Sequence, residues 1–407
     1  MTPDGDGGQG VVLLCVTGGI AAYKIPELIR RLRKAGREVE TIMTRSAESF
    51  VSPLTLATLS GRRVWREEDL LADGHGHEIP HIRLSERADV AVVAPCTAET
   101  AARLAHGRAD GLIGATLLAS RAPLLIFPSM NERMLDHPAT QESLKILADR
   151  GARVVEPGLG ALACGDEGRG RMIEPEDIAE EIARALCPAQ DLRGRRVLVT
   201  AGPTREWLDP VRFISNPSTG RMGLAMARTA WHRGADVRVV LGPVVPPCTL
   251  HGLDVVHVVS ALDMREAVME GLAWADVIVK AAAVGDYRAK EPAAHKMARH
   301  GRGEVSLDLV QNPDIAAEVG RLKRPGQLLI GFAAETDDLR VHARAKLDRK
   351  GLDVILANDV SAPGIGFASE EDVVRLIPRV GDEEVLSGTK MDVARAVWGA
   401  LARRGLL

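Results

Sequence analysis

The feature that most constrains this 407-residue chain is a pattern that occurs twice: an apolar strand, a glycine turn, a helix and a second strand. In the first half, residues 11–16 read VVLLCV and Thr17-Gly18-Gly19 form the turn. A helical pattern over 21–35 then leads to a strand at 38–43. This is a βαβ unit, in which the two strands run parallel and the helix crosses between them.

The second half begins in the same way, which predicts two domains rather than one. The run at 196–200 (RVLVT) is followed by the turn 201–203, a helix over 220–233 and a strand at 236–241. Further buried strands are expected at 89–94, 124–127 and 153–155, and then at 255–258, 277–280, 328–332 and 354–357. A late pair at 372–377 and 383–386 is typical of an antiparallel hairpin at a sheet edge.

The predicted fold is therefore α/β, with two doubly wound, Rossmann-like parallel-sheet domains in tandem. The second domain carries the short antiparallel addition. We expect a disordered tail over 1–10, a first domain over 11–187, a linker at 188–195 and a second domain over 196–407. The linker prediction rests on proline, glycine and polar residues in CPAQDLRG, which follow a helix predicted over 175–186.

Composition excludes several classes of protein. The formal net charge is −3, from 52 basic and 55 acidic residues, so the chain lacks the field of a general nucleic-acid binder. Its five cysteines are scattered without a Cys-x-x-Cys pair, which indicates neither a zinc site nor a disulfide framework. The first ten residues are glycine-rich and acidic, unlike a signal peptide, and no apolar run reaches the ~20 residues of a membrane span. We expect a cytoplasmic protein.

Three loops of the first half are candidates for a mononucleotide site. Small residues at 17–22 precede a helix, where free N–H groups attract phosphate. The segments 44–47 and 94–99 follow two further strands and carry hydroxyl groups. Ligands of open parallel sheets bind at these strand ends. An ordinary tight turn is the alternative for each loop alone, whereas the three together favour a nucleotide.

Three side chains of the first half are candidates for catalysis. His81 precedes a predicted helix, Asn131 follows a predicted strand, and Cys164 lies in a long glycine-punctuated loop that also contains arginine. Long loops in compact domains are commonly functional, and a cysteine in such a loop is a candidate acid or thiolate. The alternatives are a structural histidine, a turn-forming asparagine and a buried inert thiol.

These elements together resemble the homo-oligomeric flavin-containing cysteine decarboxylases, through the strings at 16–24, 80–84, 94–100, 128–134 and 162–172. The resemblance implies trimer-based assembly, up to a dodecamer, and an FMN that oxidises a cysteine-derived thiol before CO2 is lost. His81 would be the base, Asn131 would hold the substrate carboxylate, and Cys164 would return a proton. The residues implied for FMN are Gly18, Gly19, Ile20, Ala21, Thr44, Ser46, Thr97 and Met130.

The second half has its own polar strand ends. The run 215–220 precedes a helix and can cap it or hold a phosphate. The strand at 277–280 ends in small residues and then Asp286, and an aspartate there suits a Mg²⁺ ion that bridges a triphosphate. Lys296 lies on a following loop, and Lys346 and Lys350 share a face of a predicted helix. Solvated surface lysines are the alternative for all three.

This half closely resembles the nucleotide-dependent phosphopantothenate–cysteine ligases, through the strings at 200–223, 280–287, 312–315, 331–336, 343–351 and 357–361. The resemblance implies dimers and CTP activation through an acyl-cytidylate, with Asn216 and Lys296 in catalysis. It also implies that Arg212 and Asn216 contact the substrate and that Asp286 binds the metal. The implied nucleotide site comprises Lys280, Ala281, Ala282, Asp286, Lys296, Asn312, Pro313, Asp314, Ile315, Phe332, Lys346 and Lys350.

The two resemblances join into one hypothesis, a bifunctional enzyme of coenzyme A biosynthesis that uses FMN, Mg²⁺ and CTP. The ligase product, 4′-phosphopantothenoylcysteine, is the decarboxylase substrate. Three alternatives are a decarboxylase of peptide C-terminal cysteines, a regulatory flavoprotein with one inactive half, and a dinucleotide oxidoreductase. The last lacks the Gly-x-Gly-x-x-Gly fingerprint at both strand–helix openings.

Overall fold

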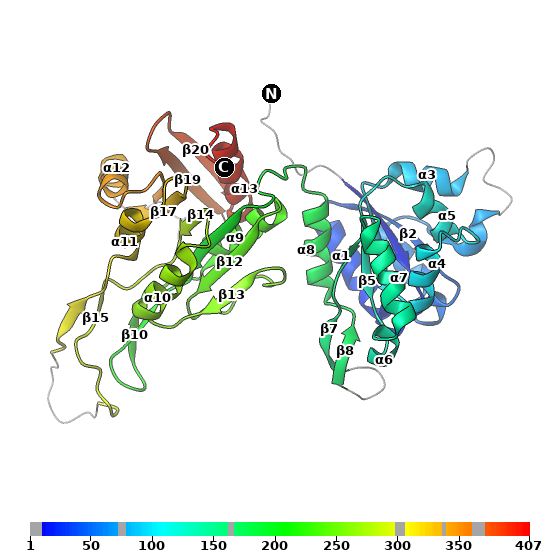
Figure 1. Ribbon diagram of the computed structural model, residues 1–407, viewed down its shortest axis with the longest axis horizontal. Helices are drawn as coiled ribbons and strands as arrows, with labels where there is room; N and C mark the ends of the chain where they lie inside the picture. The colour runs from blue at the N-terminus through cyan, green and yellow to red at the C-terminus, as the bar shows by residue number, and fades with distance from the viewer. Residues whose placement is uncertain (1–9, 72–78, 162–166, 298–305, 336–338, 360–370) are drawn as a thin grey trace. The chain divides into compact units, whose positions relative to one another are not determined.

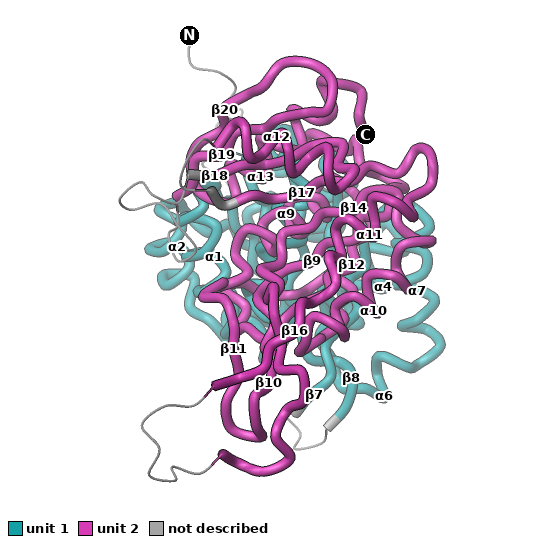
Figure 2. Tube along the Cα trace, turned by 90° about the vertical axis from the view of Figure 1, so that its left-hand side faces the viewer, with its two compact units in different colours: residues 1–187 teal, residues 188–407 magenta. Residues whose placement is uncertain are grey.

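The computed structural model describes residues 10–71, 79–161, 167–297, 306–335, 339–359 and 371–407. The chain forms two compact units, unit 1 over 1–187 and unit 2 over 188–407 (Figure 2). Each is an α/β unit built on a parallel sheet (Figure 1), as the repeated βαβ pattern predicts. The expected tail at 1–10 lies outside the described residues except for Gly10.

Unit 1 contains a six-stranded sheet in the order β3-β2-β1-β4-β5-β6, with all neighbours parallel. Its strands are β1 (Val11–Val16), β2 (Glu38–Met43), β3 (Val64–Arg66), β4 (Val90–Cys96), β5 (Leu124–Pro128) and β6 (Arg153–Val154). Helices α1 (Ile25–Lys34), α2 (Pro53–Ser60) and α8 (Pro175–Ala185) contribute to one apolar cluster, and α3 (Pro80–Arg87), α4 (Ala98–Ala105), α5 (Leu112–Ala119) and α7 (Pro138–Asp149) contribute to another.

Strand β1 shows why two layers of helices are needed. Val12, Leu14 and Val16 belong to the first cluster, whereas Leu13 and Cys15 belong to the second. Side chains of a strand alternate between the two faces of a sheet, so a strand that is apolar at every position must be covered on both. The same alternation occurs in β9 (Arg196–Ala201) of unit 2, where neighbouring valine and leucine side chains enter different clusters.

Unit 2 repeats the strand order of unit 1 and extends it. The order is β13-β12-β9-β14-β17-β18-β19-β20, where the pairs up to β18 are parallel and the last two are antiparallel. The added strands are β19 (Glu371–Pro378) and β20 (Glu384–Thr389), which confirms the predicted edge hairpin. The others are β12 (Asp236–Leu241), β13 (Asp254–His257), β14 (Val277–Lys280), β17 (Leu328–Glu335) and β18 (Val354–Asp359).

The helices of unit 2 also divide between two apolar clusters. Helices α9 (Arg221–His232) and α13 (Lys390–Arg403) contribute to one, and α10 (Ala261–Leu272), α11 (Ile315–Leu322) and α12 (Leu339–Arg349) contribute to the other. Trp398 of α13 is fully buried, and its indole Nε1–H donates to the Met226 carbonyl of α9 at 3.1 Å. The last helix of the chain therefore packs on the first helix of this unit.

Several short hairpins were not predicted. Strands β7 (Gly158–Ala161) and β8 (Glu167–Arg171) pair in unit 1, after the short helix α6 (Glu132–Leu135). In unit 2, β10 (Arg205–Trp207) pairs with β11 (Phe213–Ser215), and β15 (Tyr287–Ala289) pairs with β16 (Leu309–Gln311). Each of these strands is too short to show a clear alternation in the sequence.

The segment expected to be a linker at 188–195 packs against unit 2. Leu192 is fully buried in the core of this unit, and the Gln190 amide donates to the His232 carbonyl at 3.1 Å. Asp191 forms an ion pair with Arg233. The proline and glycine that suggested a domain boundary lie at the start of unit 2, which begins at residue 188. Within the described residues, no helix is long and apolar enough to cross a membrane.

Candidate active sites

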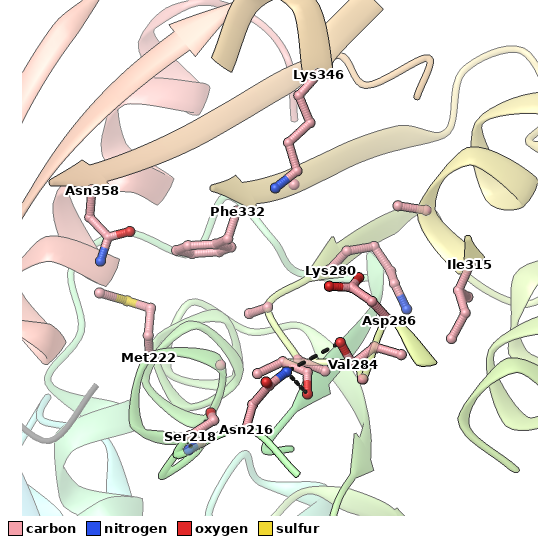
Figure 3. A pocket seen from close by; sticks show the side chains of 18 of the residues that line it. Asn216, Ser218, Met222, Lys280, Val284, Asp286, Ile315, Phe332, Lys346 and Asn358 are labelled. Atoms are coloured by element: carbon pink, nitrogen blue, oxygen red, sulfur yellow. Dashed lines mark hydrogen bonds between the residues drawn. The ribbon is translucent and has the colours of Figure 1, made fainter. Parts of the chain in front are cut away.

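The pocket of unit 2 lies where the strand order of the sheet changes direction. Strand β9 begins the unit at the centre of the sheet, with β12 on one side and β14 on the other. Loops from the carboxyl ends of two such strands diverge, which leaves a crevice for ligands. A pocket of about 460 Å³ lies there, lined by the segment before α9, the loop after β14, the segment between β16 and α11, and residues of α12 (Figure 3).

The loop after β14 is held by two buried threonines, Thr200 in β9 and Thr204 in the turn that follows β9. The Thr200 hydroxyl accepts from the Ala282 N–H at 3.2 Å, and the Thr204 hydroxyl accepts from the Gly285 N–H at 2.9 Å. Small side chains in this loop leave its backbone accessible to a ligand. Gly220, before α9, has φ +72°, and a Cβ there would lie 3.2 Å from the Gly202 backbone nitrogen. Glycine permits both the conformation and the close approach.

Asn216 connects the two walls of the pocket. It lies between β11 and α9, and its Nδ2 donates to the carbonyls of Ala283 and Val284, both at 3.3 Å (Figure 3). The carboxamide is exposed and lines the pocket, so its position is fixed by the opposite loop while it remains accessible to a ligand.

Asn312, Asp314 and Lys350 form a second ordered group. The Asn312 amide donates to the Gly285 carbonyl at 2.8 Å, and the Asp314 carboxylate accepts from the Ala317 N–H at 3.1 Å to cap α11. Lys350 lies 3.1 Å from the Asp314 carboxylate. Burial tends to raise the pKa of Asp314, but the Ala317 N–H and the lysine more than offset it, so the pKa lies below its usual range. This carboxylate is therefore ionised at neutral pH.

Lys280, the last residue of β14, has an unusual environment. Its side chain is only 8% exposed, it lines the pocket, and its Nζ has no hydrogen-bond partner among the described residues. Desolvation and, to a smaller extent, Lys350 lower the pKa of this ammonium to about 7, against the opposing effect of Asp314. An ammonium without a partner is costly to bury, so it needs either a ligand or the neutral form.

The structure brings together most residues that the sequence predicts for this site. Twelve line the one pocket: Asn216, Lys280, Ala281, Ala282, Asp286, Asn312, Pro313, Asp314, Ile315, Phe332, Lys346 and Lys350. They come from distant parts of the chain, and the shared pocket is consistent with one ligand. What that ligand is stays a prediction at this point.

Arg212 and Lys296 are not in the lining of this pocket. The Arg212 guanidinium lies 3.3 Å from the buried Asp209 carboxylate and donates to the Met297 carbonyl at 3.2 Å. Met297 in turn donates its N–H to Asp209 at 3.1 Å, which holds the exposed Lys296 beside the β10–β11 hairpin. A contact of either residue with a ligand in the same chain would need this segment to move.

The sequence analysis did not name every residue of the pocket lining, and those that it left out include Met222, Asn358, Asp372 and Lys390. The last two form a buried ion pair, with 3.3 Å between Lys390 Nζ and the Asp372 carboxylate. They lie on β19 and at the start of α13, far along the chain from the glycine-containing turns. An acidic residue on the predicted edge hairpin and a lysine at a helix start were the only signals, and both are common on protein surfaces.

In unit 1 the loops after β1, β2 and β4 converge. The Thr17 hydroxyl donates to the Pro95 carbonyl at 2.6 Å and accepts from the Thr97 N–H at 3.3 Å. A Cβ on Gly18 would lie 2.3 Å from the Ser46 hydroxyl, and one on Gly19 would lie 3.7 Å from the Thr97 side chain. The structure therefore places Gly18, Gly19, Ser46 and Thr97 close together. Ile20, Ala21 and Thr44 adjoin them in the chain, and Met130 follows β5.

The catalytic candidates of unit 1 lie at element starts. His81 is the second residue of α3, and its Nδ1 is buried without a hydrogen-bond partner among the described residues. Asn131 follows β5 and caps α6, because its Oδ1 accepts from the Arg133 N–H at 2.9 Å. Cys164 lies outside the described residues, between β7 and β8.

The hairpin of β7 and β8 is attached beside Asn131. Met130 donates its N–H to the Gly170 carbonyl at 3.0 Å, and Arg169 lies 2.8 Å from the Asp136 carboxylate. A Cβ on Gly170 would lie 2.1 Å from the Met130 carbonyl oxygen, so the two backbones meet only because residue 170 is glycine. The described ends of the hairpin are thus fixed next to the candidate carboxylate-binding loop.

Comparisons with known proteins assign a class to each unit. Residues 3–187 match the family model Flavoprotein, and residues 192–404 match the DNA/pantothenate metabolism flavoprotein C-terminal domain. The coenzyme A biosynthesis bifunctional protein CoaBC of Vibrio cholerae is 42% identical over 95% of this chain and 96% of its own. That of Escherichia coli K12 is 43% identical over 91% of each chain. The crystal structure of a CoaBC C-terminal domain is 38% identical, covering 53% of this chain and 98% of that one, with a TM-score of 0.45.

The chain is thus a tandem of a flavoprotein domain and a pantothenate-metabolism domain. It belongs to the family of coenzyme A biosynthesis bifunctional proteins, CoaBC, which unite a phosphopantothenoylcysteine decarboxylase with a phosphopantothenate–cysteine ligase. The prediction of a bifunctional enzyme is confirmed, and the alternative of one inactive half is not favoured.

Proposed function

We propose that unit 2 joins 4′-phosphopantothenate to cysteine at the expense of CTP, and that unit 1 then decarboxylates the product with FMN. The observation that carries the proposal is the single pocket that gathers Asn216, Asp286 and the lysines of β14 and α12. A triphosphate needs cationic groups, backbone N–H donors and a metal ligand within one crevice, and this pocket contains all three.

In the ligase reaction the pantothenate carboxylate attacks the α-phosphorus of CTP, and pyrophosphate leaves. The cysteine amine then attacks the acyl carbon of the acyl-cytidylate, and CMP leaves. Asn216 is held by two carbonyls of the opposite loop, so its carboxamide can orient the acyl-phosphate without first being ordered. Ser218, Thr219 and Gly220 line the same pocket just before α9, and the N-terminus of this helix suits the phosphate oxygens.

The carboxylate of Asp286 and its surroundings are chemically suited to binding Mg²⁺. It is an exposed carboxylate that lines the pocket, and the described residues contain no group of three or more metal-ligating side chains. A metal here would therefore take most of its ligands from phosphate oxygens and water, which Mg²⁺ accepts readily. We infer that the metal enters with the nucleotide rather than as a resident ion.

The converging loops of unit 1 fit the phosphate end of FMN. Gly18 keeps space beside Ser46 that any larger side chain would fill, and the Thr44 and Ser46 hydroxyls lie 3.2 Å apart at the surface. The residues that would hold the group are Gly18, Gly19, Ile20, Ala21, Thr44, Ser46, Thr97 and Met130. When bound, FMN supplies the two-electron chemistry that makes the substrate carboxylate a leaving group.

The protein residues of unit 1 would bind and move protons. His81 would remove a proton from the substrate, Asn131 would hold its carboxylate, and Cys164 would return a proton to the product. The Asn131 Oδ1 accepts from the Arg133 N–H at its helix cap, which fixes the carboxamide, and a carboxylate would accept from its Nδ2. The described part of the β7–β8 hairpin is anchored on Met130 through Gly170.

We also propose that the protein is a cytoplasmic homo-oligomer, built from ligase dimers and flavin-domain trimers, up to a dodecamer. Exposed apolar side chains support this for both units. In unit 1, Ile20 is 54% and Tyr23 is 60% exposed beside the flavin loops, and in unit 2, Trp207 and Phe213 are exposed on the β10–β11 hairpin. Apolar groups gathered at a surface commonly mark an interface.

A coupled assay tests the proposal. The purified full-length protein is given 4′-phosphopantothenate, cysteine, CTP and Mg²⁺, and CMP and CO2 are measured together. We expect both products in equal amounts. CMP without CO2 would contradict the decarboxylase assignment, and no CMP with any nucleoside triphosphate would contradict the ligase assignment.

A further inference from the structure

Asp209 is a buried carboxylate of unit 2 to which neither proposed reaction assigns a role. It lies in the turn between β10 and β11, and its side chain has no exposed surface. A carboxylate is costly to remove from water unless hydrogen-bond donors surround it. The groups that donate to Asp209 therefore indicate what this residue does in the fold.

The donors of Asp209 come from two segments that are far apart in the chain. Its Oδ1 accepts from the backbone N–H groups of Val211 and Arg212, both at 2.8 Å. Its Oδ2 accepts from the backbone N–H of Met297 at 3.1 Å and lies 3.3 Å from the Arg212 guanidinium. One oxygen thus fixes the turn that contains Asp209, and the other attaches the segment after β15 to this turn.

Two further hydrogen bonds join the same two segments. The Ala293 N–H donates to the Leu208 carbonyl at 2.9 Å, and the Arg212 guanidinium donates to the Met297 carbonyl at 3.2 Å. Lys296 lies in the chain between Ala293 and Met297, so it is held on both sides. The turn that carries Arg212 and the segment that carries Lys296 are therefore attached to each other through Asp209 and its neighbours.

We infer that Asp209 is a positioning residue of the ligase site, which holds Arg212 and Lys296 in a fixed arrangement relative to each other. The inference deepens the proposed ligase function and rests on it, because the substrate contact of Arg212 and the catalytic role of Lys296 are expected of that function. Neither residue is part of the pocket lining within the described chain. Their arrangement therefore depends on the contacts of the turn rather than on the pocket wall.

Asp209→Asn is the most informative substitution. Asparagine has the shape of aspartate but only one acceptor oxygen, because its NH2 group cannot accept a hydrogen bond. We expect this oxygen to keep the two donors of its own turn, so that the Met297 N–H loses its partner and Lys296 is released. A misplacement of about 1 Å costs about 10²-fold in rate, and we expect kcat for CMP formation to fall by about this factor. KM for CTP should change less than kcat.

The control variant is Asp308→Asn. Asp308 is exposed, directly precedes β16 and is not in the pocket lining, so the same chemical change there should leave CMP formation at the wild-type rate. All variants are full-length proteins. CO2 release from supplied phosphopantothenoylcysteine should be unchanged in each of them, because that activity belongs to unit 1.

A double-mutant cycle separates a positioning role from a merely structural one. Asp209→Asn is combined with Lys296→Gln, and kcat for CMP formation is measured in all four proteins at high enzyme concentration. If Asp209 acts through Lys296, Asp209→Asn should cost no more than about twofold in the Lys296→Gln protein, whereas independent effects would multiply. A second cycle with Arg212→Gln, read through KM for 4′-phosphopantothenate, should show the same dependence.

Amide hydrogen exchange gives a measurement that does not depend on activity or on a folded variant. In ligand-free wild type, the Met297 amide should exchange slowly, although the neighbouring Lys296 side chain is exposed. In Asp209→Asn the same amide should exchange faster. Rapid exchange of this amide in wild type would overturn the inference, because it would show that Asp209 does not hold the segment.

The outcomes distinguish this inference from the proposed function. A wild-type rate for Asp209→Asn, or effects that multiply in both cycles, would show the inference to be wrong while the ligase assignment stands. If wild type itself forms no CMP from 4′-phosphopantothenate, cysteine and CTP, the proposed function fails first. The exchange measurement then still decides whether Asp209 attaches the two segments.

Discussion

The two units share a strand order but present their sites differently. In unit 2, twelve predicted residues line one pocket of about 460 Å³ within a single chain. In unit 1, the glycine and hydroxyl loops converge, and a cavity lined by Thr44 and Thr100 has only about 10 Å³. The same topology therefore yields a concave site in one unit and a surface site in the other, at least within the described residues.

The strand order therefore determines where the ligand-binding loops lie, but it does not determine how far the surrounding chain encloses the site. In unit 2 the enclosure comes from additions, because the lining includes Asp372 of β19 and Lys390 of α13, which have no counterpart in the sheet of unit 1. In unit 1, Ile20 and Tyr23 are exposed beside the glycine turn after β1. The predictions below test how independent the two sites are.

The largest expected effect is on decarboxylation alone. His81→Gln removes the candidate base while keeping a polar side chain of similar reach, and we expect CO2 release to fall about 10²- to 10⁴-fold. CMP formation should be unchanged, because His81 belongs to the other unit. A loss of both activities would show that the two sites are coupled.

Asn216→Ala tests the opposite case, a loss of the ligase activity while decarboxylation is unchanged. Losing the side chain that orients the acyl-phosphate costs about 10²-fold in rate, and we expect this loss in CMP formation. CO2 release from supplied phosphopantothenoylcysteine should stay at the wild-type rate. Asn216→Asp is the matched variant, and it should not rescue the ligase because a carboxylate cannot donate to the Ala283 and Val284 carbonyls and would repel phosphate.

Gly18→Ala tests whether FMN binds at the glycine turn after β1. The added Cβ would lie 2.3 Å from the Ser46 hydroxyl, so the two loops must separate. We expect about a tenfold weaker FMN affinity, measured by flavin fluorescence during dilution. Ser46→Gly in the same chain should recover part of the loss by removing the clash. Unchanged affinity in Gly18→Ala would place FMN elsewhere.

The smallest effect concerns stability rather than activity. The pKa of Lys280 is lowered to about 7 in the native state from 10.5, so the unfolded state binds more protons between these values. The free energy of unfolding of unit 2 should therefore rise with pH over this range. Urea denaturation of ligand-free Lys280→Met should show a stability advantage over wild type that is larger at pH 7 than at pH 10. A constant difference would contradict the shifted pKa.

Much of the fold was predictable because buried parallel strands are apolar at every position. The runs at 11–16 and 196–200 are apolar on both faces of the strand, so helices have to cover both faces of the sheet. The glycine turns then placed the ligand-binding loops. The hairpins β10–β11 and β15–β16 were missed because three-residue strands contain too few positions for a pattern.

The site was predictable where a loop directly follows a strand, as at Lys280 and Asp286, and less so elsewhere. Asp372 and Lys390 reach the pocket only through the packing of the edge hairpin and the last helix, which no local pattern encodes. The substrate contact of Arg212 was implied by the family resemblance and stays a prediction; in this structure its guanidinium contacts Asp209 and Met297.

The packing of α13 on α9 has a consequence for how the protein is made. The helix that begins the pocket wall at Arg221 is held at Met226 by Trp398, and Lys390 closes another part of the wall. During translation, unit 1 is complete after residue 187, but the nucleotide pocket has to wait until the ribosome has released the region around residue 403. A nascent chain should thus be able to gain its flavin site well before it can consume a nucleotide.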